Sequence, residues 1–346
     1  DGRRASWCYG SPGIARAIYI AGNAIGDKEA IELSLKAIDG LCNMEEKEWR
    51  LNSPTICHGY GGLLSLVQAM YQEASEVLGY DIRKVIDEEP EKLNDTLYTQ
   101  PAIVVVSLSI AEVLKQEFNL QPILASGFSL GEYSALSAGG IFSFRDIVYL
   151  IKERARLMEE ASRASKGKMA AVIGMEQEEL LEICESISNE EGFVTIANYN
   201  CPGQLVISGH AKKVKELESL LEGKARRFIP VNVSGAFHTD LMKPAAEGLK
   251  KAIEQVSIHD PKYPVIMNVN AKPLDLNQLP ELMVQQVYSP VLYEDTLRRM
   301  IQEGVEWFIE VGPGKVLSGF LRRIDRKIKV ISINNLNDLK QLESGV

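Results

Sequence analysis

Apolar residues in the first 75 positions recur every three or four residues, the period that gives a helix one hydrophobic face. The pattern predicts three helices, over residues 11–21, 28–43 and 61–74. Ser11 followed by Pro12 suits the N-cap and first turn of the first of them. We therefore expect residues 1–75 to form an all-α segment.

From about residue 76 the pattern changes to alternating helices and strands. Residues 102–106 are apolar, and after Ser107 the apolar positions continue at helical spacing through Ile110, Val113 and Leu114, so the segment predicts a helix. A short buried strand over 123–127 leads into a helix over 130–138. The same alternation predicts, further along, a helix over 240–256, a strand over 265–268, a helix over 293–303 and a strand over 307–311.

A compact unit interrupts this alternation between residues 168 and 234. Its predicted strands cover 169–174, 194–200, 204–209 and 226–233, and its predicted helices cover 176–187 and 211–222. The order β-α-β-β-α-β is that of the ferredoxin-like fold. The sequence thus predicts an α/β protein with a ferredoxin-like subdomain inserted into a larger unit.

Composition places the chain among ordinary globular proteins, with 45% hydrophobic and 25% charged residues. A net charge of -9 argues against a nucleic-acid partner, because phosphate binding needs a basic surface. We expect no membrane partner either, since no apolar run approaches the roughly 20 residues that cross a bilayer and no signal peptide is visible. Five cysteines, an odd number without a secretion signal, are typical of a reduced, cytoplasmic protein.

Residues 127–131 read Gly-Phe-Ser-Leu-Gly, a G-x-S-x-G sequence between a predicted strand and a predicted helix. Such a turn exposes the Oγ atom of Ser129 at a helix N-terminus and directs the Leu130 N–H toward a developing oxyanion. We expect the turn to leave no room for a Cβ atom on Gly127 or Gly131. The motif favours Ser129 as a nucleophile; the alternative is a serine that only caps the helix.

A serine nucleophile needs a base, and the chain has four histidines. His210 follows a predicted strand, His238 ends a loop before a helix, and His259 lies in a proline-containing connection. Periodicity does not choose among these three residues.

Several motifs beyond the serine pentapeptide occur together in one order. They lie at residues 99–103, 127–136, 198–204, 235–242 and 310–315. This series, over roughly residues 76–346, resembles the malonyl-CoA:acyl-carrier-protein transacylases. The resemblance implies an α/β-hydrolase-like parallel-sheet core, formed by 76–167 and 235–346, with the ferredoxin-like subdomain over 168–234. It also implies malonyl-CoA and acyl carrier protein as substrates and no cofactor for the acyl transfer.

The resemblance assigns catalytic roles to individual residues. Ser129 is the nucleophile, His238 is its base, and the Leu130 N–H binds the oxyanion. Gln286 matches the residue whose backbone carbonyl orients the imidazole, so its side chain is expected to matter little.

Substrate recognition is implied for three more residues. Arg154 matches the arginine that pairs with the malonyl carboxylate, a task that suits the planar guanidinium fork. Phe237 matches the bulky residue that favours malonyl over α-branched acyl groups, and Gln100 belongs to the substrate-binding set. Phe128 stands where the family usually has histidine, and we expect little effect there.

The front of the chain departs from this family, whose members begin with a strand that enters a Gly-Gln-Gly loop. The glutamine N–H of that loop is the second oxyanion donor, and the chain has neither the strand nor the loop. The departure implies a gap in the parallel sheet and impaired activity.

Residues 1–75 instead resemble the C-terminal part of lanthionine synthetase C-like cyclases, through the motifs around Cys8 and at residues 57–59. That resemblance implies that Cys8, Cys57 and His58 bind zinc, with one position left open, as in catalytic zinc sites. Two alternatives to the transacylase therefore stand beside it: a zinc-binding remnant of a lanthionine-forming cyclase, and an inactive chimera.

Overall fold

The computed structural model describes residues 60–343 apart from Asn119, Ser234 and Leu336, together with Lys28, Glu32 and Lys36. The chain divides into two compact units, Asp1–Gln72 and Glu73–Val346. The predicted helix over 11–21 lies outside the described residues, as does most of the one over 28–43. Helix α3 spans Tyr60–Leu78, so the helix expected over 61–74 is present and longer than expected.

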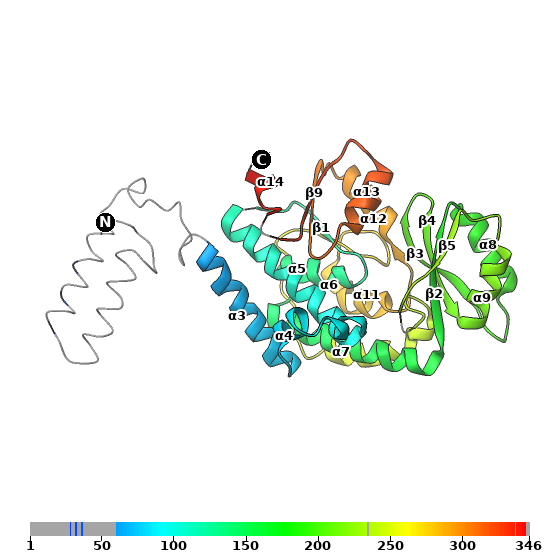
Figure 1. The fold of residues 1–346 in the computed structure, drawn as a ribbon, viewed down its shortest axis with the longest axis horizontal. Helices are drawn as coiled ribbons and strands as arrows, with labels where there is room; N and C mark the ends of the chain where they lie inside the picture. The colour runs from blue at the N-terminus through cyan, green and yellow to red at the C-terminus, as the bar shows by residue number, and fades with distance from the viewer. Residues whose placement is uncertain are drawn as a thin grey trace. The chain divides into compact units, whose positions relative to one another are not determined.

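Helices form most of the second unit outside its inserted subdomain (Figure 1). They are α4 (Ile82–Asp87), η2 (Pro90–Asn94), α5 (Thr96–Phe118), α6 (Leu130–Ala138), α7 (Phe144–Ser165), η3 (Asp240–Met242), α10 (Lys243–Ile253), η4 (Leu276–Gln278), α11 (Leu279–Gln286), α12 (Tyr293–Gln302), α13 (Val316–Ile324) and α14 (Lys340–Glu343). Helix α5 packs against α6 and α7, and α7 also packs against α10. These contacts bury the apolar faces of the four helices in one core.

Helix α5 contains a proline, Pro101, in its second turn. Proline has no N–H to donate to the carbonyl four residues earlier, which belongs to Leu97. The Tyr80 hydroxyl donates to that carbonyl at 3.5 Å. By length and composition, Thr96–Gln116 is apolar enough to cross a membrane. A buried core helix has the same length and composition, and Val104 and Val105 at the centre of α5 are fully buried.

The strands of the large subdomain form short parallel pairs. Strand β1 (Ala125–Ser126) pairs with β6 (Val265–Ile266), and β8 (Trp307–Val311) pairs with β9 (Lys329–Ile333), both in parallel. Within the described part of the chain these pairs belong to two separate two-stranded sheets. The α/β class is confirmed, and the parallel core is present as these two pieces.

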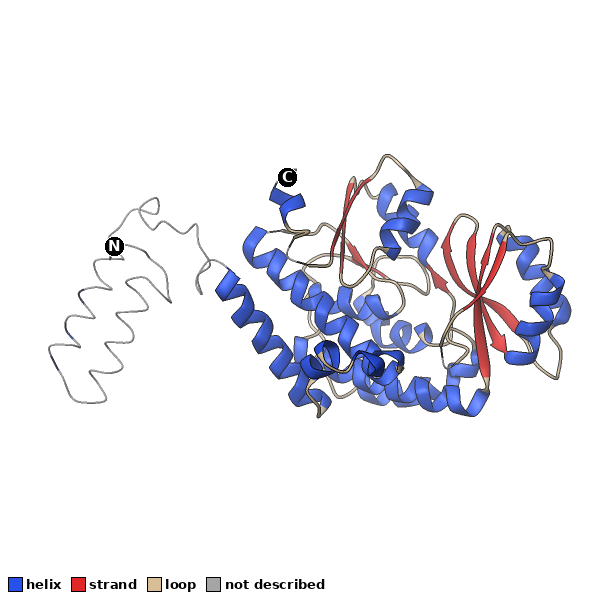
Figure 2. Cartoon of the chain, viewed as in Figure 1, coloured by secondary structure: helices blue, strands red, loops and turns tan. Residues whose placement is uncertain are grey.

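The inserted subdomain contains β2 (Gly167–Ile173), α8 (Gln177–Ile187), β3 (Val194–Cys201), β4 (Gln204–His210), α9 (Ala211–Leu220) and β5 (Arg227–Pro230). Its strands lie in the order β5-β2-β4-β3 and are antiparallel throughout, as the ferredoxin-like arrangement requires. Helices α8 and α9 cover one face of this sheet (Figure 2). Strand β7 (Val291–Leu292), from the large subdomain, extends the sheet by pairing in parallel with β3.

Most differences from the predicted elements concern their ends. Strand β1 has two residues where five were expected, and the predicted helix over 240–256 begins with the 3-10 turn η3. The sequence analysis did not predict the short elements α4, η2, η4, β7 and α14, which contain too few residues to show a period. It also gave no range for α7, α11, α13 or β9, although α7 has 22 residues.

Candidate active site

Ser129 lies in the sharp turn between β1 and α6. Its backbone has φ 48° and ψ -101°, which a non-glycine residue adopts only where its surroundings enforce it. A Cβ atom on Gly127 would lie 1.9 Å from the carbonyl carbon of Gly131, so the turn requires glycine at 127. A Cβ atom on Gly131 would meet nothing within 4 Å. The expectation that both glycines are sterically required is therefore wrong for Gly131.

The hydroxyl of Ser129 faces a histidine rather than the helix. Ser129 stands at the N-cap position of α6, yet its side chain makes no capping hydrogen bond. Its Oγ atom lies 2.7 Å from Nε2 of His238. The helix-capping alternative therefore does not describe this side chain.

His238 is buried and held from its other nitrogen. Nδ1 lies 2.8 Å from the carbonyl oxygen of Gln286, and because a carbonyl only accepts, Nδ1 carries the proton. Nε2 is then free to accept the Ser129 hydroxyl proton. Burial, followed by the nearby Arg154 charge, lowers the pKa of His238 to about 4. The imidazole is thus neutral at physiological pH, as an acceptor must be.

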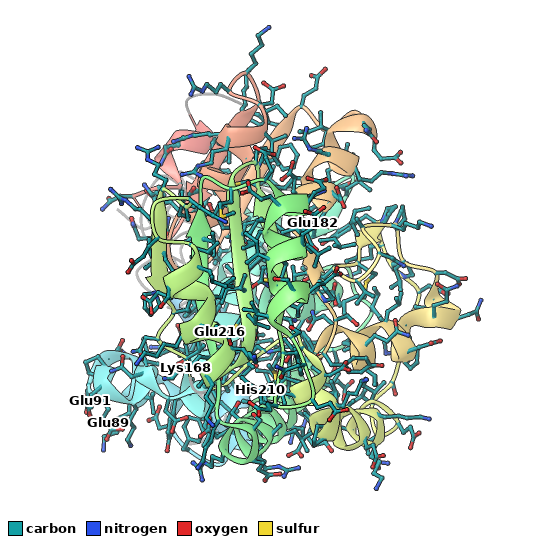
Figure 3. The ribbon with its side chains drawn as sticks, turned by 90° about the vertical axis from the view of Figure 1, so that its right-hand side faces the viewer. Glu89, Glu91, Lys168, Glu182, His210 and Glu216 are labelled. Atoms are coloured by element: carbon teal, nitrogen blue, oxygen red, sulfur yellow. The ribbon has the colours of Figure 1, made fainter. Side chains whose placement is uncertain are left out.

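The other two candidate bases, His210 and His259, lie away from Ser129 and His238. His210 ends β4 in the inserted subdomain, where Figure 3 labels it together with Lys168 and Glu216. Its Nδ1 accepts from the Phe193 backbone N–H at 3.1 Å, and its ring packs edge-on against the phenyl ring. His259 is exposed. The structure therefore brings only His238 to Ser129 among these three.

Arg154 of α7 is 2% exposed and lies beside the Ser129–His238 pair. One guanidinium nitrogen, Nη2, lies 3.2 Å from Ser129 Oγ and 3.2 Å from Gln286 Oε1. The other, Nη1, donates to Oε1 of Gln100 at 2.5 Å. Its Nε has no hydrogen-bond partner among the described residues. Every direct partner of this buried cation is uncharged.

Glu132 on α6 is fully buried, and its charge and that of the Arg154 guanidinium act on each other. Glu132 accepts from the Asn268 backbone N–H at 2.5 Å and from the Gln286 side-chain amide at 2.9 Å. Burial raises the pKa of the Glu132 carboxyl to about 8, against the opposing effects of those donors and of Arg154. No ion pair joins Glu132 to Arg154 in the described structure.

Gln286, at the end of α11, contributes its side chain as well as its backbone carbonyl. Its Nε2 donates to the Ser129 carbonyl oxygen at 2.8 Å and to Glu132, while Oε1 accepts from Arg154. The side chain is 0% exposed. The expectation that it would matter little is therefore wrong, because it links the turn, the carboxyl and the guanidinium.

Phe128 and Phe237 pack in two separate hydrophobic clusters. Phe128 packs edge-on against Tyr293 and against Phe320 of α13. Phe237 packs on the β-sheet of the inserted subdomain, near Met169. Phenylalanine, which stands here where the family usually has histidine, thus places its apolar ring in a hydrophobic cluster.

A cavity of about 290 Å³ opens beside His238. Its other lining residues are Phe193, Thr195, Thr239, Asp240, Tyr288 and Pro290. The lining is mixed, with aromatic rings and hydroxyls from both the inserted subdomain and the large one. An uncharged, flexible chain with amide and hydroxyl groups would suit it.

The sequence analysis gave no role to two residues of this site, Asn268 and Glu132. Asn268, just after β6, accepts the Ser129 N–H with Oδ1 at 2.7 Å and donates from Nδ2 to the Gly127 carbonyl at 2.7 Å. Glu132 accepts the hydrogen bond from the Asn268 backbone N–H. A carboxylate in the first turn of a helix ordinarily faces solvent, and no pattern marks an asparagine at a strand end as buried. Only the tertiary fold joins them.

Metal-ligating residues do not gather in the part of the chain that the structure describes: no group of three or more His, Cys, Asp or Glu side chains is arranged there to hold an ion. Cys184 and Cys201 are free and buried, and burial raises the pKa of the Cys184 thiol to about 12. The predicted zinc ligands Cys8, Cys57 and His58 lie outside the described residues.

Comparison with known proteins extends over most of the chain. The family described as "Acyl transferase domain" matches residues 66–333. The malonyl CoA-acyl carrier protein transacylase of Bacillus subtilis (strain 168) is 43% identical over 269 residues, which is 77% of this chain and 84% of that protein. The chain belongs to the acyl transferase family.

Solved structures agree with this membership. The crystal structure of MCAT from Streptococcus pneumoniae has a TM-score of 0.78 and 42% identity, over 83% of this chain and 94% of that one. A complex of a type II PKS acyl-carrier protein with its malonyl-transacylase, PlMCAT:AntF, has a TM-score of 0.78 and 32% identity, over 83% and 93% of the two chains.

The N-terminal resemblance is also found. The family described as "Lanthionine synthetase C-like protein" matches residues 1–100. The two family matches overlap over residues 66–100, a stretch that begins within α3 and ends in α5.

Proposed function

We propose that this acyl transferase moves a malonyl group from malonyl-CoA to the phosphopantetheine thiol of acyl carrier protein, through an acyl-Ser129 intermediate. The reaction would serve fatty acid or polyketide synthesis in the cytoplasm. One observation carries the proposal: the buried guanidinium of Arg154 lies 3.2 Å from the Ser129 hydroxyl and has only uncharged direct partners.

A buried cation without an anionic partner favours an acidic ligand. Taking a charge out of water costs several kcal/mol, and a partner of opposite charge offsets that cost. A carboxylate fits the planar fork of arginine through two parallel hydrogen bonds. Malonyl carries a free carboxylate two carbons from its thioester carbonyl. Bound to Arg154, the carboxylate would place that carbonyl near Ser129 Oγ, whereas acetyl has no group for Arg154.

The first half-reaction acylates Ser129. As Oγ attacks the thioester carbonyl carbon, Nε2 of His238 takes the hydroxyl proton. The Gln286 carbonyl holds the imidazole in the tautomer this transfer needs, since it accepts from Nδ1. Collapse of the tetrahedral intermediate breaks the C–S bond, and the His238 proton passes to the departing CoA thiolate. Malonyl remains on Ser129 as an oxygen ester.

The oxyanion of that intermediate would be bound by the Leu130 N–H at the start of α6. The first N–H groups of a helix have no acceptor within it, and the helix dipole favours negative charge there. The loss of a single oxyanion donor lowers the rate by ~10²–10³-fold. The family's second donor comes from the loop that this sequence lacks, so we infer a slower enzyme than its relatives.

The second half-reaction reverses the first with a different thiol. The cavity beside His238 suits the uncharged pantetheine portion of the phosphopantetheine arm of acyl carrier protein. There His238 removes the thiol proton, the sulfur attacks the malonyl ester carbon, and the Ser129–acyl bond breaks. Ser129 recovers its proton from His238. Gln100 would hold Arg154 in place, and Phe237 would restrict branching on the acyl chain.

Stepwise acylation tests the proposal. Malonyl-CoA alone should label Ser129, and later addition of holo acyl carrier protein should remove the label and form malonyl-carrier thioester. An enzyme that hydrolyses malonyl-CoA without loading the carrier would overturn the transferase assignment. An intact chain that is not labelled at all would favour the alternative of an inactive chimera.

The match of residues 1–100 to lanthionine synthetase C-like proteins supports a second candidate, a zinc-binding remnant. Cys8, Cys57 and His58 would be its ligands. Metal analysis of the purified chain, with a Cys8→Ala/Cys57→Ala variant as control, tests it. About one zinc per chain, lost in the variant, would support the remnant, and zinc-free protein would exclude it.

A further inference from the structure

The backbone of Ser129 is fixed by two buried amide side chains, one on each side. Asn268 Oδ1 accepts the Ser129 N–H at 2.7 Å, and Gln286 Nε2 donates to the Ser129 carbonyl at 2.8 Å. Both side chains are 0% exposed. Water therefore does not compete for these bonds, which act on the residue with φ 48°.

Asn268 uses all its polar groups around the turn. Its Nδ2 donates to the Gly127 carbonyl at 2.7 Å, and its backbone N–H donates to Glu132 at 2.5 Å. Its backbone carbonyl accepts from the Leu292 N–H at 2.9 Å. The residue thus joins both ends of the serine turn to the first turn of α6 and to the strand β7.

We propose that Asn268 is a positioning residue for acyl transfer: it holds the strained turn so that Ser129 Oγ stays in line with His238. This inference rests on the proposed function of Ser129 as nucleophile. A residue with φ 48° would relax toward a common conformation if one of its peptide groups were released. Such relaxation turns Oγ away from Nε2, which lies 2.7 Å from it.

Only a side chain with one acceptor and one donor satisfies both bonds. An ionised aspartate accepts the Ser129 N–H but sets a second oxygen against the Gly127 carbonyl, where both atoms only accept. A protonated aspartic acid restores the donor. The charged or titratable groups around this site are Glu132 on α6, Arg154 on α7 and His238 in the loop before η3. Burial next to Glu132 raises the pKa of an introduced carboxyl above its usual ~3.9.

Asn268→Asp should therefore be rescued by acid. The assay is the rate at which a fluorophosphonate probe labels Ser129, which needs an activated serine but no malonyl. Relative to the unmodified chain, labelling of Asn268→Asp should rise from pH 9 to pH 5, by up to about tenfold for each pH unit above the pKa of the introduced carboxyl. His238, with its pKa lowered to about 4, stays neutral across this range.

Asn268→Leu is the matched control, because leucine has a similar size and no polar atom. It should label about 10²-fold more slowly at every pH, since a shift of about 1 Å in a reacting group has that cost. With malonyl-CoA, kcat should fall in both variants while KM, set by Arg154, stays unchanged.

Parallel pH profiles for Asn268→Asp and Asn268→Leu would overturn the inference. A rise in KM, or a fall in kcat that only follows the fall in melting temperature, would overturn it as well. If instead the unmodified chain labels with fluorophosphonate but not with malonyl-CoA, the proposed function fails while the role of Asn268 stands.

Discussion

Removal of the Arg154 guanidinium tests substrate recognition most sharply. The group is 2% exposed, and its direct partners are the uncharged side chains of Gln100, Ser129 and Gln286. Arg154→Ala should therefore leave the malonyl carboxylate unpaired in a buried site. The loss of one partner of a buried charge pair costs about 2–5 kcal/mol. At 1.4 kcal/mol per factor of ten, kcat/KM for malonyl-CoA should fall roughly 30- to 4,000-fold.

Acetyl-CoA provides the internal control for this variant. Acetyl lacks the carboxylate, so its slow transfer should fall far less, and the ratio of malonyl to acetyl transfer should collapse. Arg156 provides the positional control on the same helix. Its side chain is 46% exposed and pairs with Glu153 at 2.7 Å and Glu160 at 2.8 Å. Such pairs contribute about 0–1 kcal/mol, so Arg156→Ala should be nearly silent.

The assay follows release of CoA at a range of concentrations of each thioester, with holo acyl carrier protein as acceptor. Equal losses of malonyl and acetyl transfer in Arg154→Ala would refute carboxylate recognition by this residue. A larger malonyl-specific loss in Arg156→Ala would show that the wrong arginine had been chosen.

Three further predictions concern the base, its titration and the front of the chain. His238→Ala should slow acylation of Ser129 by several orders of magnitude, whereas His210→Ala and His259→Ala should not; equal losses in all three would leave the choice of base unsupported. Because the pKa of His238 is lowered to about 4, fluorophosphonate labelling of the unmodified chain should stay level from about pH 7, below the pKa of about 8 of Glu132, to about pH 5 and decline only as the imidazole gains its proton near pH 4; a decline centred near the ordinary pKa of ~6.5 would contradict that burial effect. Replacing the first 75 residues by the strand and Gly-Gln-Gly loop of the family should raise both the melting temperature and, by at least ~10²-fold, the transfer rate; a native chain that already equals the graft in both would show that the missing donor had been replaced.

Many of the longer elements were predicted from their period, although the 22-residue helix α7 was not. Helix α6 was predicted over 130–138 and is present over Leu130–Ala138. The four strands and two helices of the inserted subdomain were predicted in their order, because each strand alternates or is apolar and each helix is amphipathic. The two-residue strands β1, β6 and β7 are defined by their neighbours, so their bounds depend on tertiary pairing.

The candidate site was predicted in part, through residues that motifs mark. Ser129 and His238 were both named, and the structure sets them 2.7 Å apart. Glu132 lies within the motif at residues 127–136 but was given no role, and Asn268 lies in none of the motifs. Their importance depends on burial and on a hydrogen bond between residues 136 positions apart. The side chain of Gln286 was misjudged for the same reason: its three partners come from distant parts of the chain.

The malonylation of Ser129 tests the central claim most directly. After incubation of the chain with malonyl-CoA, peptide mass spectrometry should find one malonyl group on the peptide that contains Ser129, and none on the same peptide of Ser129→Ala. Addition of holo acyl carrier protein should transfer that group to the carrier thiol. Label that persists in Ser129→Ala, or a Ser129 ester that the carrier cannot remove, would contradict the account.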